Sequence, residues 1–246
     1  MKTIDTVLEN SEITIDLMPG CKTLINNGTG LGDKRGYGLC ETLAYDVTGM
    51  AIVQDDVMAG IRASGSSVGV ANAIAYDDVM AGTKYAVENF DFIDGDRLGT
   101  TGGSYGGYLV NWIATQTDMF KGIVSLRSIS NLYTKYGVSD IGWYGNRRGM
   151  GGADLWDSED FIMSRSAIRF APNVKTPILL VHSLEDYRCP FEQAEQFYVA
   201  LKRLQNAPVE LIAFKGENHE LSRSGKPMNR MDRLKAIVNW FEKYVK

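Results

Sequence analysis

A serine framed by glycines limits most strongly what this chain can fold into. The segment from Gly102 to Gly107 reads Gly-Gly-Ser-Tyr-Gly-Gly and lies between a predicted strand, Arg97–Gly102, and a predicted helix, Tyr105–Thr115. A chain that turns so sharply from strand into helix brings its own backbone together, and glycines remove the side chains that would clash. We therefore expect Ser104 to lie in a strained turn, with its hydroxyl projecting from the carboxyl edge of a sheet.

Two plainer readings of this segment are a glycine-rich turn that only packs closely and a loop that binds phosphate. A Walker loop would end in Gly-Lys-Ser or Gly-Lys-Thr, and a dinucleotide fingerprint would read Gly-x-Gly-x-x-Gly with an acid about twenty residues further on. The chain shows neither pattern at this position. The strand-to-helix context therefore favours a nucleophilic serine.

Short apolar segments alternate with longer amphipathic ones, which is typical of a parallel sheet covered by helices. We expect one α/β domain of the α/β-hydrolase type over residues 1–246, with a mostly parallel central sheet and helices on both faces. A stretch rich in Gly, Arg, Trp and Asp at about residues 140–173 has no clear strand and is expected to be an insertion above the sheet. The expected strands are Ile13–Met18, Thr23–Asn26, Met50–Gln54, Arg97–Gly102, Gly122–Leu126, Ile178–Ser183 and Val209–Lys215, and the expected helices are Leu39–Thr48, Asp77–Asn89, Tyr105–Thr115, Phe191–Leu204 and Asn229–Tyr244.

Composition narrows the class of partner. The chain has 246 residues and a net charge of −4, which argues against a nucleic acid or an anionic membrane, because those surfaces attract an excess of Lys and Arg. No apolar run approaches the ~18 residues that span a bilayer, and residues 1–10 do not read as a secretory signal. Cys21, Cys40 and Cys189 have neither paired nor metal-like spacing. We therefore expect a reduced, cytoplasmic chain without metal or cofactor, and leave its oligomeric state open.

The choice of a general base is narrow because the chain has only two histidines. His182 lies within the apolar segment Ile178–Ser183 and is expected to pack at a strand end, bonded to backbone. His219 follows Val209–Lys215 in a polar loop, and a loop at the carboxyl end of a strand can bring a base to the nucleophile. Taken alone, His219 could equally be a solvated loop residue.

The acid that would orient this base lies in the loop after Ile178–Ser183, where Glu185 and Asp186 are adjacent. Asp186 is the preferred acid, but local sequence does not separate the two carboxylates. The order of Ser104, then this loop, then His219, each after a strand end, is the chain order of α/β-hydrolase triads. The agreement of order and topology favours a catalytic triad.

Three segments resemble the catalytic domain of the prolyl oligopeptidase family, in particular its acylaminoacyl-peptidase-like branch. They are Thr101–Tyr108 around the serine, Glu185–Pro190 with Gln193 around the aspartate, and Glu217–Glu220 with Arg223 and Pro227 around the histidine. The likeness runs from about Tyr76 to the C-terminus and is weaker before that. It implies an α/β-hydrolase fold with Ser104 as nucleophile, His219 as base and Asp186, rather than Glu185, as the orienting acid.

Two departures from the family pattern bear on activity. The family's N-terminal β-propeller, which limits entry to short peptides, is expected to be missing because the chain begins within the hydrolase domain. The family's His-Gly-Gly-Pro segment, which supplies an oxyanion amide, is replaced by Asn26–Gly30. A backbone donor needs no particular side chain, so Gly28 and the Tyr105 amide remain the expected oxyanion hole.

Side chains of the expected insertion and of the aspartate loop are candidates for binding substrate. Trp143 and Tyr144 are expected walls of an apolar pocket, although core packing is the stronger reading for Trp143. Arg188 is expected to meet a substrate carboxylate or carbonyl, with surface ion pairing as the alternative.

The expected reaction is acyl transfer through Ser104 on a small peptide or ester. The family resemblance favours a peptidase. A carboxylesterase is the close alternative, because esters tolerate an imperfect oxyanion hole and an open site. A non-catalytic, hydrolase-like binding protein is the third reading, prompted by the altered Asn26–Gly30 segment.

Overall fold

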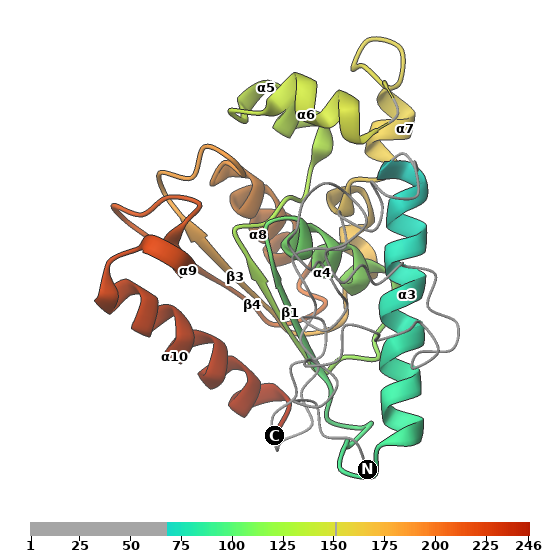
Figure 1. The fold of residues 1–246 in the computed structure, drawn as a ribbon, viewed down its shortest axis with the longest axis vertical. Helices are drawn as coiled ribbons and strands as arrows, with labels where there is room; N and C mark the ends of the chain where they lie inside the picture. The colour runs from blue at the N-terminus through green and yellow to red at the C-terminus, as the bar shows by residue number, and fades with distance from the viewer. Residues whose placement is uncertain (1–67, 151) are drawn as a thin grey trace, which may run out of the picture.

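Four parallel strands form the sheet in the described part of the chain, residues 68–150 and 152–246 of a computed structural model (Figure 1). They lie side by side in chain order, and each pairs in parallel with the next. Parallel neighbours of this kind require a crossover between successive strands, and the carboxyl ends of all four meet at one edge. The strands are β1 (Gly99–Gly103), β2 (Gly122–Leu126), β3 (Ile178–Ser183) and β4 (Val209–Phe214).

Alternate residues of the central strands enter two separate apolar clusters, one on each face of the sheet. Ile123 and Leu180 belong to the larger cluster, whereas their neighbours Val124 and Val181 belong to a smaller one. Successive side chains of a strand point to opposite faces, so the continuous aliphatic runs in β2 and β3 are buried on both sides.

Helices supply the partners for both clusters. Helix α10 (Pro227–Tyr244) packs on β2 and β3 from one side, while α4 (Tyr105–Gln116) packs on β1 and β2 and α8 (Glu192–Leu204) on β3 and β4. Figure 1 shows α10 on one side of the sheet and α4, α8 and α3 (Val68–Asn89) on the other. The parallel sheet with helices on both faces that the sequence predicts is therefore present in the described residues.

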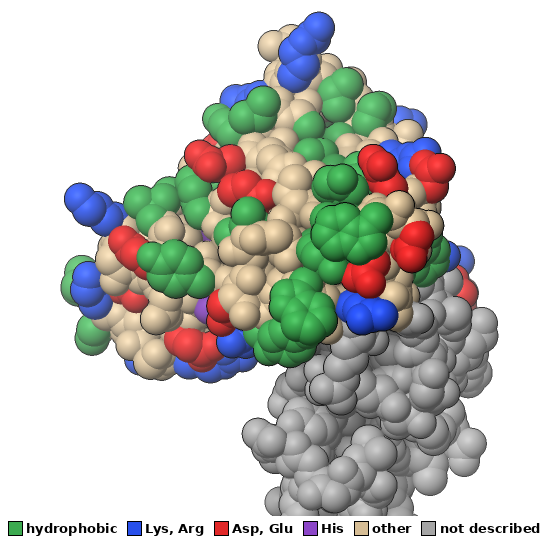
Figure 2. All heavy atoms as spheres, turned by 90° about the horizontal axis from the view of Figure 1, so that it is seen from above, with side chains coloured by type: hydrophobic (Ala, Val, Ile, Leu, Met, Phe, Trp, Pro, Cys, Tyr) green, Lys and Arg blue, Asp and Glu red, His purple; other side chains and the backbone are tan. Residues whose placement is uncertain are grey.

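The segment between β2 and β3 contains helices and turns but no strand in the described residues. Helices α5, α6 and α7 lie at the top of the view in Figure 1, and Figure 2 looks down on that side, where apolar side chains gather. That residues 140–173 are an insertion stays a prediction. The elements are α5 (Leu132–Val138), α6 (Gly142–Gly149), α7 (Glu159–Met163) and the 3₁₀ helix η3 (Ala167–Asn173).

In the described residues the element boundaries lie within two residues of those expected from the sequence, except at the start of α3. Two of the differences have local reasons. β1 begins at Gly99 because Arg97 belongs to the preceding turn, where its Nε lies 2.6 Å from Asp94 Oδ2. α3 begins at Val68 rather than at Asp77, since the intervening residues include alanines and no proline. The strands expected at residues 13–18, 23–26 and 50–54 and the helix expected at 39–48 lie outside the described residues.

Two glycines in helices provide a matched test of this packing. An ideal Cβ on Gly107 in α4 would lie 2.6 Å from the Leu126 carbonyl oxygen, whereas a Cβ on Gly137 in α5 would meet nothing within 4 Å. We expect Gly107→Ala to cost about 1–3 kcal/mol through overpacking. Gly137→Ala should gain about 0.4–1 kcal/mol by restricting the unfolded chain. Urea unfolding of both variants measures the difference, and equal stabilities would contradict the close contact at Gly107.

Candidate active site

Ser104 occupies the turn between β1 and α4 and has the left-handed backbone that this turn requires. Its φ is 61° and its ψ −119°, values that L-residues rarely adopt. A Cβ on Gly102 would run into the backbone of Gly106, so a side chain there would block the turn. The Ser104 N–H donates to the Leu126 carbonyl at 3.0 Å, which ties the turn to the end of β2.

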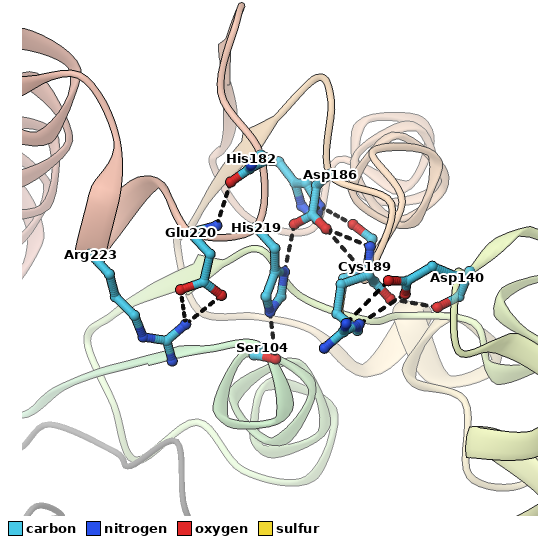
Figure 3. Close-up of polar contacts among 11 residues, drawn as sticks. Ser104, Asp140, His182, Asp186, Cys189, His219, Glu220 and Arg223 are labelled. Carbon is cyan, nitrogen blue, oxygen red and sulfur yellow. Dashed lines mark hydrogen bonds and ion pairs between the residues drawn. The ribbon is translucent and has the colours of Figure 1, made fainter.

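The Ser104 hydroxyl faces an imidazole that in turn faces a buried carboxylate (Figure 3). His219 Nε2 lies 2.9 Å from Ser104 Oγ, and His219 Nδ1 lies 2.7 Å from Asp186 Oδ2. Because an ionised carboxylate only accepts, the Asp186 contact assigns the ring proton to Nδ1 and leaves Nε2 free to accept the serine proton. The structure thus brings together the three residues that the sequence selected.

Asp186 is positioned by the backbone of its own loop. Its side chain is fully buried, and its Oδ1 accepts hydrogen bonds from the N–H groups of Arg188 at 3.0 Å and Cys189 at 2.8 Å. These amides satisfy one oxygen and direct the other to His219. The described contacts give the neighbouring Glu185 side chain no hydrogen bond to this ring, so geometry favours Asp186 over Glu185.

His182 is the second histidine, and it does not contact the serine. It lies on β3 with 1% of its surface exposed, and its Nε2 lies 2.7 Å from the Cys189 carbonyl oxygen. This is the backbone-bonded, packed position expected from the sequence. Burial lowers the pKa of this imidazole.

Cys189 is a second potential nucleophile close to the serine. Its thiol interacts with the Ser104 side chain, and burial raises the pKa of the thiol to about 12. A thiol with such a pKa remains protonated near neutral pH, and the thiolate is the reactive form. Ser104 is therefore the better candidate nucleophile, with the neutral thiol as part of its surroundings.

Tyr105 is the first residue of α4, so its amide belongs to the end of the helix where N–H groups have no acceptor within the helix. That end carries the positive pole of the helix dipole, which favours a developing oxyanion. Burial raises the pKa of the Tyr105 phenol and keeps it neutral. Gly28, the other expected oxyanion donor, lies outside the described residues.

The candidate substrate-binding residues lie at the surface. Trp143 and Tyr144 on α6 are 59% and 50% exposed, and their rings meet edge to face at 6.1 Å. The prediction that Trp143 packs in the core is therefore wrong, because α6 turns the Trp143 side chain away from the apolar core. Arg188 makes a two-pronged ion pair with Asp140, with Nε–Oδ1 at 2.8 Å and Nη2–Oδ2 at 3.1 Å. That pair raises the pKa of Arg188 and lowers the pKa of Asp140.

Glu217 helps to hold the histidine loop in place, a role that the sequence analysis did not assign to it. It lies in the histidine loop with 5% of its surface exposed, and its Oε1 accepts from Lys226 N at 3.0 Å and Asn229 Nδ2 at 2.6 Å. Its own carbonyl accepts the Glu185 N–H, which links the histidine loop to the aspartate loop. The available signal was a glutamate two residues before His219 and shortly before the start of α10.

A cavity of about 180 Å³ lies beside the serine turn, but its lining does not include the three reacting side chains. It is bounded by the ends of β1, β2 and β3 and by α9 (Leu221–Ser224) and α10, with Gly103, Arg127 and Arg233 among its walls.

Within residues 68–150 and 152–246 no group of three His, Cys, Asp or Glu side chains is placed to hold a metal ion. No described helix is both long and apolar enough to cross a bilayer.

Comparisons with known proteins bear on this geometry. The chain is 43% identical to the uncharacterized peptidase YuxL of Bacillus subtilis (strain 168) over 170 residues, which are 69% of this chain and 26% of that protein. It is 29% identical to dipeptidyl-peptidase 5 of Porphyromonas gingivalis over 160 residues, 63% of this chain and 22% of that one. The acylaminoacyl peptidase of Pyrococcus horikoshii superimposes with a TM-score of 0.69 at 37% identity, covering 72% of this chain and 29% of that one.

The chain thus spans about a quarter of the length of the curated relatives it matches, 26% of one and 22% of the other. Residues 71–246 match the prolyl oligopeptidase family, and the matched part contains all three residues of the hydrogen-bonded relay. This chain belongs to the prolyl oligopeptidase family.

Proposed function

We propose that this chain is a serine hydrolase that acts as a peptidase, with Ser104 as nucleophile, His219 as general base and Asp186 as the acid that orients the base. The hydrogen-bonded relay carries the proposal, with 2.9 Å from Ser104 Oγ to His219 Nε2 and 2.7 Å from His219 Nδ1 to Asp186 Oδ2. Both distances are within the reach that proton transfer requires.

The relay supports a two-step acyl transfer. Ser104 Oγ attacks the carbonyl carbon of the substrate while His219 Nε2 takes the serine proton, and the oxyanion forms next to the N-terminal end of α4. The imidazolium then gives the proton to the leaving nitrogen or oxygen, and the acyl group remains on the serine. Water, deprotonated by the same imidazole, releases the acyl group and restores the serine.

A short peptide with a blocked or free N-terminus is the proposed substrate class. The names of the relatives support it, since they include an acylaminoacyl peptidase and a dipeptidyl-peptidase. We propose that Trp143, Tyr144 and Arg188 contact the substrate. Arg188 lies two residues after Asp186, and the Tyr144 hydroxyl lies near enough to Arg188 to influence the pKa of its guanidinium.

A carboxylesterase is the second candidate, favoured by one observation in the sequence. The segment from Asn26 to Gly30 lacks the proline and the first glycine of the family's oxyanion loop. An ester has a better leaving group than an amide and depends less on a well-formed oxyanion hole.

We also propose a cytoplasmic location, supported by the free, buried thiol of Cys189.

The nucleophile is tested by covalent labelling. Because a fluorophosphonate reacts with an activated serine, the wild-type chain should be labelled at Ser104 and the Ser104→Ala variant should not. The variant should also lose about 10⁴-fold or more in kcat, as triad losses do. Mass spectrometry of the labelled peptide measures the first outcome, and labelling that persists in the variant would remove Ser104 from its proposed role.

The orienting acid is tested by two adjacent substitutions. Asp186→Asn should lower kcat about 10⁴-fold, because the amide favours the wrong imidazole tautomer. Glu185→Gln serves as the matched control and should remain within a small factor of wild type, since within the described residues the Glu185 carboxylate makes no hydrogen bond to His219. Comparable losses in kcat at both positions would contradict the assignment.

Substrate preference is tested with a matched ester and amide. We expect kcat/KM for an acyl p-nitrophenyl ester to exceed that for the corresponding anilide, because one poorly aimed oxyanion donor costs about 10²–10³-fold and an amide depends on it more. An anilide cleaved as fast as its ester would show that the altered Asn26–Gly30 segment leaves the oxyanion hole intact.

A further inference from the structure

We propose that His182 is a positioning residue for this reaction: its imidazole, held with the proton on Nε2, locks the turn of residues 186–189 and thereby aims the Asp186 carboxylate at His219. The inference rests on the proposed function, because it concerns how reactive Ser104 becomes. His182 would then support the reaction, whereas the sequence analysis expected it only to pack at a strand end.

The hydrogen bond of His182 dictates where its proton lies. Nε2 is 2.7 Å from the Cys189 carbonyl oxygen, and a carbonyl oxygen only accepts, so Nε2 carries the hydrogen. In the neutral ring Nδ1 then holds a lone pair. Nδ1 is buried and has no hydrogen-bond partner among the described residues, so a proton there would bury an N–H without an acceptor.

The carbonyl that His182 binds belongs to the same residue that holds Asp186. The Cys189 N–H donates to Asp186 Oδ1 at 2.8 Å, and the Arg188 N–H donates to the same oxygen at 3.0 Å. Cys189 is therefore fixed at its N–H by Asp186 and at its carbonyl by His182. Rotation of this turn would break one of these bonds, so Asp186 Oδ2 stays directed at His219.

Asp186 Oδ2 lies between two imidazole rings. It is 2.7 Å from His219 Nδ1 and 3.6 Å from His182 Nε2, with the His182 and Asp186 side chains 1% and 0% exposed. The longer distance is beyond a hydrogen bond, yet the polar Nε2–H still favours negative charge on Oδ2, because both side chains are buried. A fully charged His182 would instead compete with the imidazolium of His219 for the same oxygen.

The groups around His182 keep its ring neutral. Burial is the largest influence and lowers the pKa of His182, while the backbone hydrogen bond and the charge of Asp186 act in the opposite direction. Among the described residues, His219 and Arg127 also act on the ring, and both lower its pKa. Arg233, which lines the same cavity as His182, is a further cation on this side. Phe191 packs edge-on against the ring at 5.9 Å and limits its rotation.

The tautomer of His182 can be observed directly, because the full chain contains only two histidines. In protein labelled with ¹⁵N-histidine, the ring nitrogen shifts distinguish protonated from unprotonated positions, and loss of one ring's signals in His182→Gln assigns them. We expect His182 to keep its proton on Nε2, with Nδ1 bare, from about pH 5 to 8. A His182 ring protonated on Nδ1, or one that titrates in this range, overturns the proposal.

Reactivity is tested with a matched pair of substitutions. His182→Gln places an N–H donor near the position of Nε2, whereas His182→Met has similar length and volume but no donor. The readout is the rate constant for fluorophosphonate labelling of Ser104 against pH. We expect the Met variant to react about 10- to 100-fold more slowly, as small misplacements of reacting groups do. The acid limb of its pH profile, where the labelling rate falls as His219 becomes protonated, should move to lower pH. The reason is that a misdirected Asp186 stabilises the His219 imidazolium less.

The Gln variant should keep most of the wild-type rate and the wild-type acid limb. Equal rates and equal acid limbs for the Met and Gln variants would show that the ring only packs, and would overturn the proposal. If the Met variant does not fold, the tautomer of the His182 ring in the wild-type chain decides whether the proposal stands. Failure of the proposed function looks different: the wild-type chain itself would not be labelled at Ser104, whereas the His182 tautomer would still be measurable.

Discussion

The contact between Gly102 and Gly106 at the end of β1 determines where the serine hydroxyl lies. A side chain on Gly102 would run into the Gly106 backbone, so β1 can pass directly into α4 only with glycine at this point. The resulting left-handed backbone of Ser104 is strained, and the packing of α4 against β1 and β2 holds it in place. With a relaxed backbone the residue would continue the strand or the helix, and its side chain would enter the core.

The partners of this hydroxyl come from distant parts of the sequence. His219 is 115 residues from Ser104 and 33 from Asp186, so no local structure can place them together. The parallel register does so, because β1, β3 and β4 all end at the same edge of the sheet. The Glu185 N–H bond to the Glu217 carbonyl then joins the last two loops directly. The triad thus depends on strand order as much as on its own residues.

The sequence predicted those features that depend on the hydrophobic pattern and on the order of motifs along the chain. The bounds of β2 and β3, the fold class and the choice of Ser104 and His219 followed from hydrophobic runs, glycine spacing and chain order. The choice of Asp186 over Glu185 followed from the family resemblance alone. Contacts between separate elements did not follow. The Arg188–Asp140 pair joins residues 48 apart, and nothing in either local segment indicates the other. Core packing was the stronger reading for Trp143 because tryptophans are usually well buried, but the direction in which α6 faces leaves this side chain exposed.

The two histidines show why residue type alone could not select the base. A general base must gain and release a proton, so the protonated ring needs a partner for each nitrogen. His219 meets this condition, since Nδ1–H stays bonded to Asp186 while Nε2 exchanges its proton with Ser104. His182 does not, because its Nε2 is occupied by a carbonyl and its buried Nδ1 has no partner among the described residues. Both rings lie beside the same carboxylate, and their unequal hydrogen bonding leaves only one of them able to carry charge.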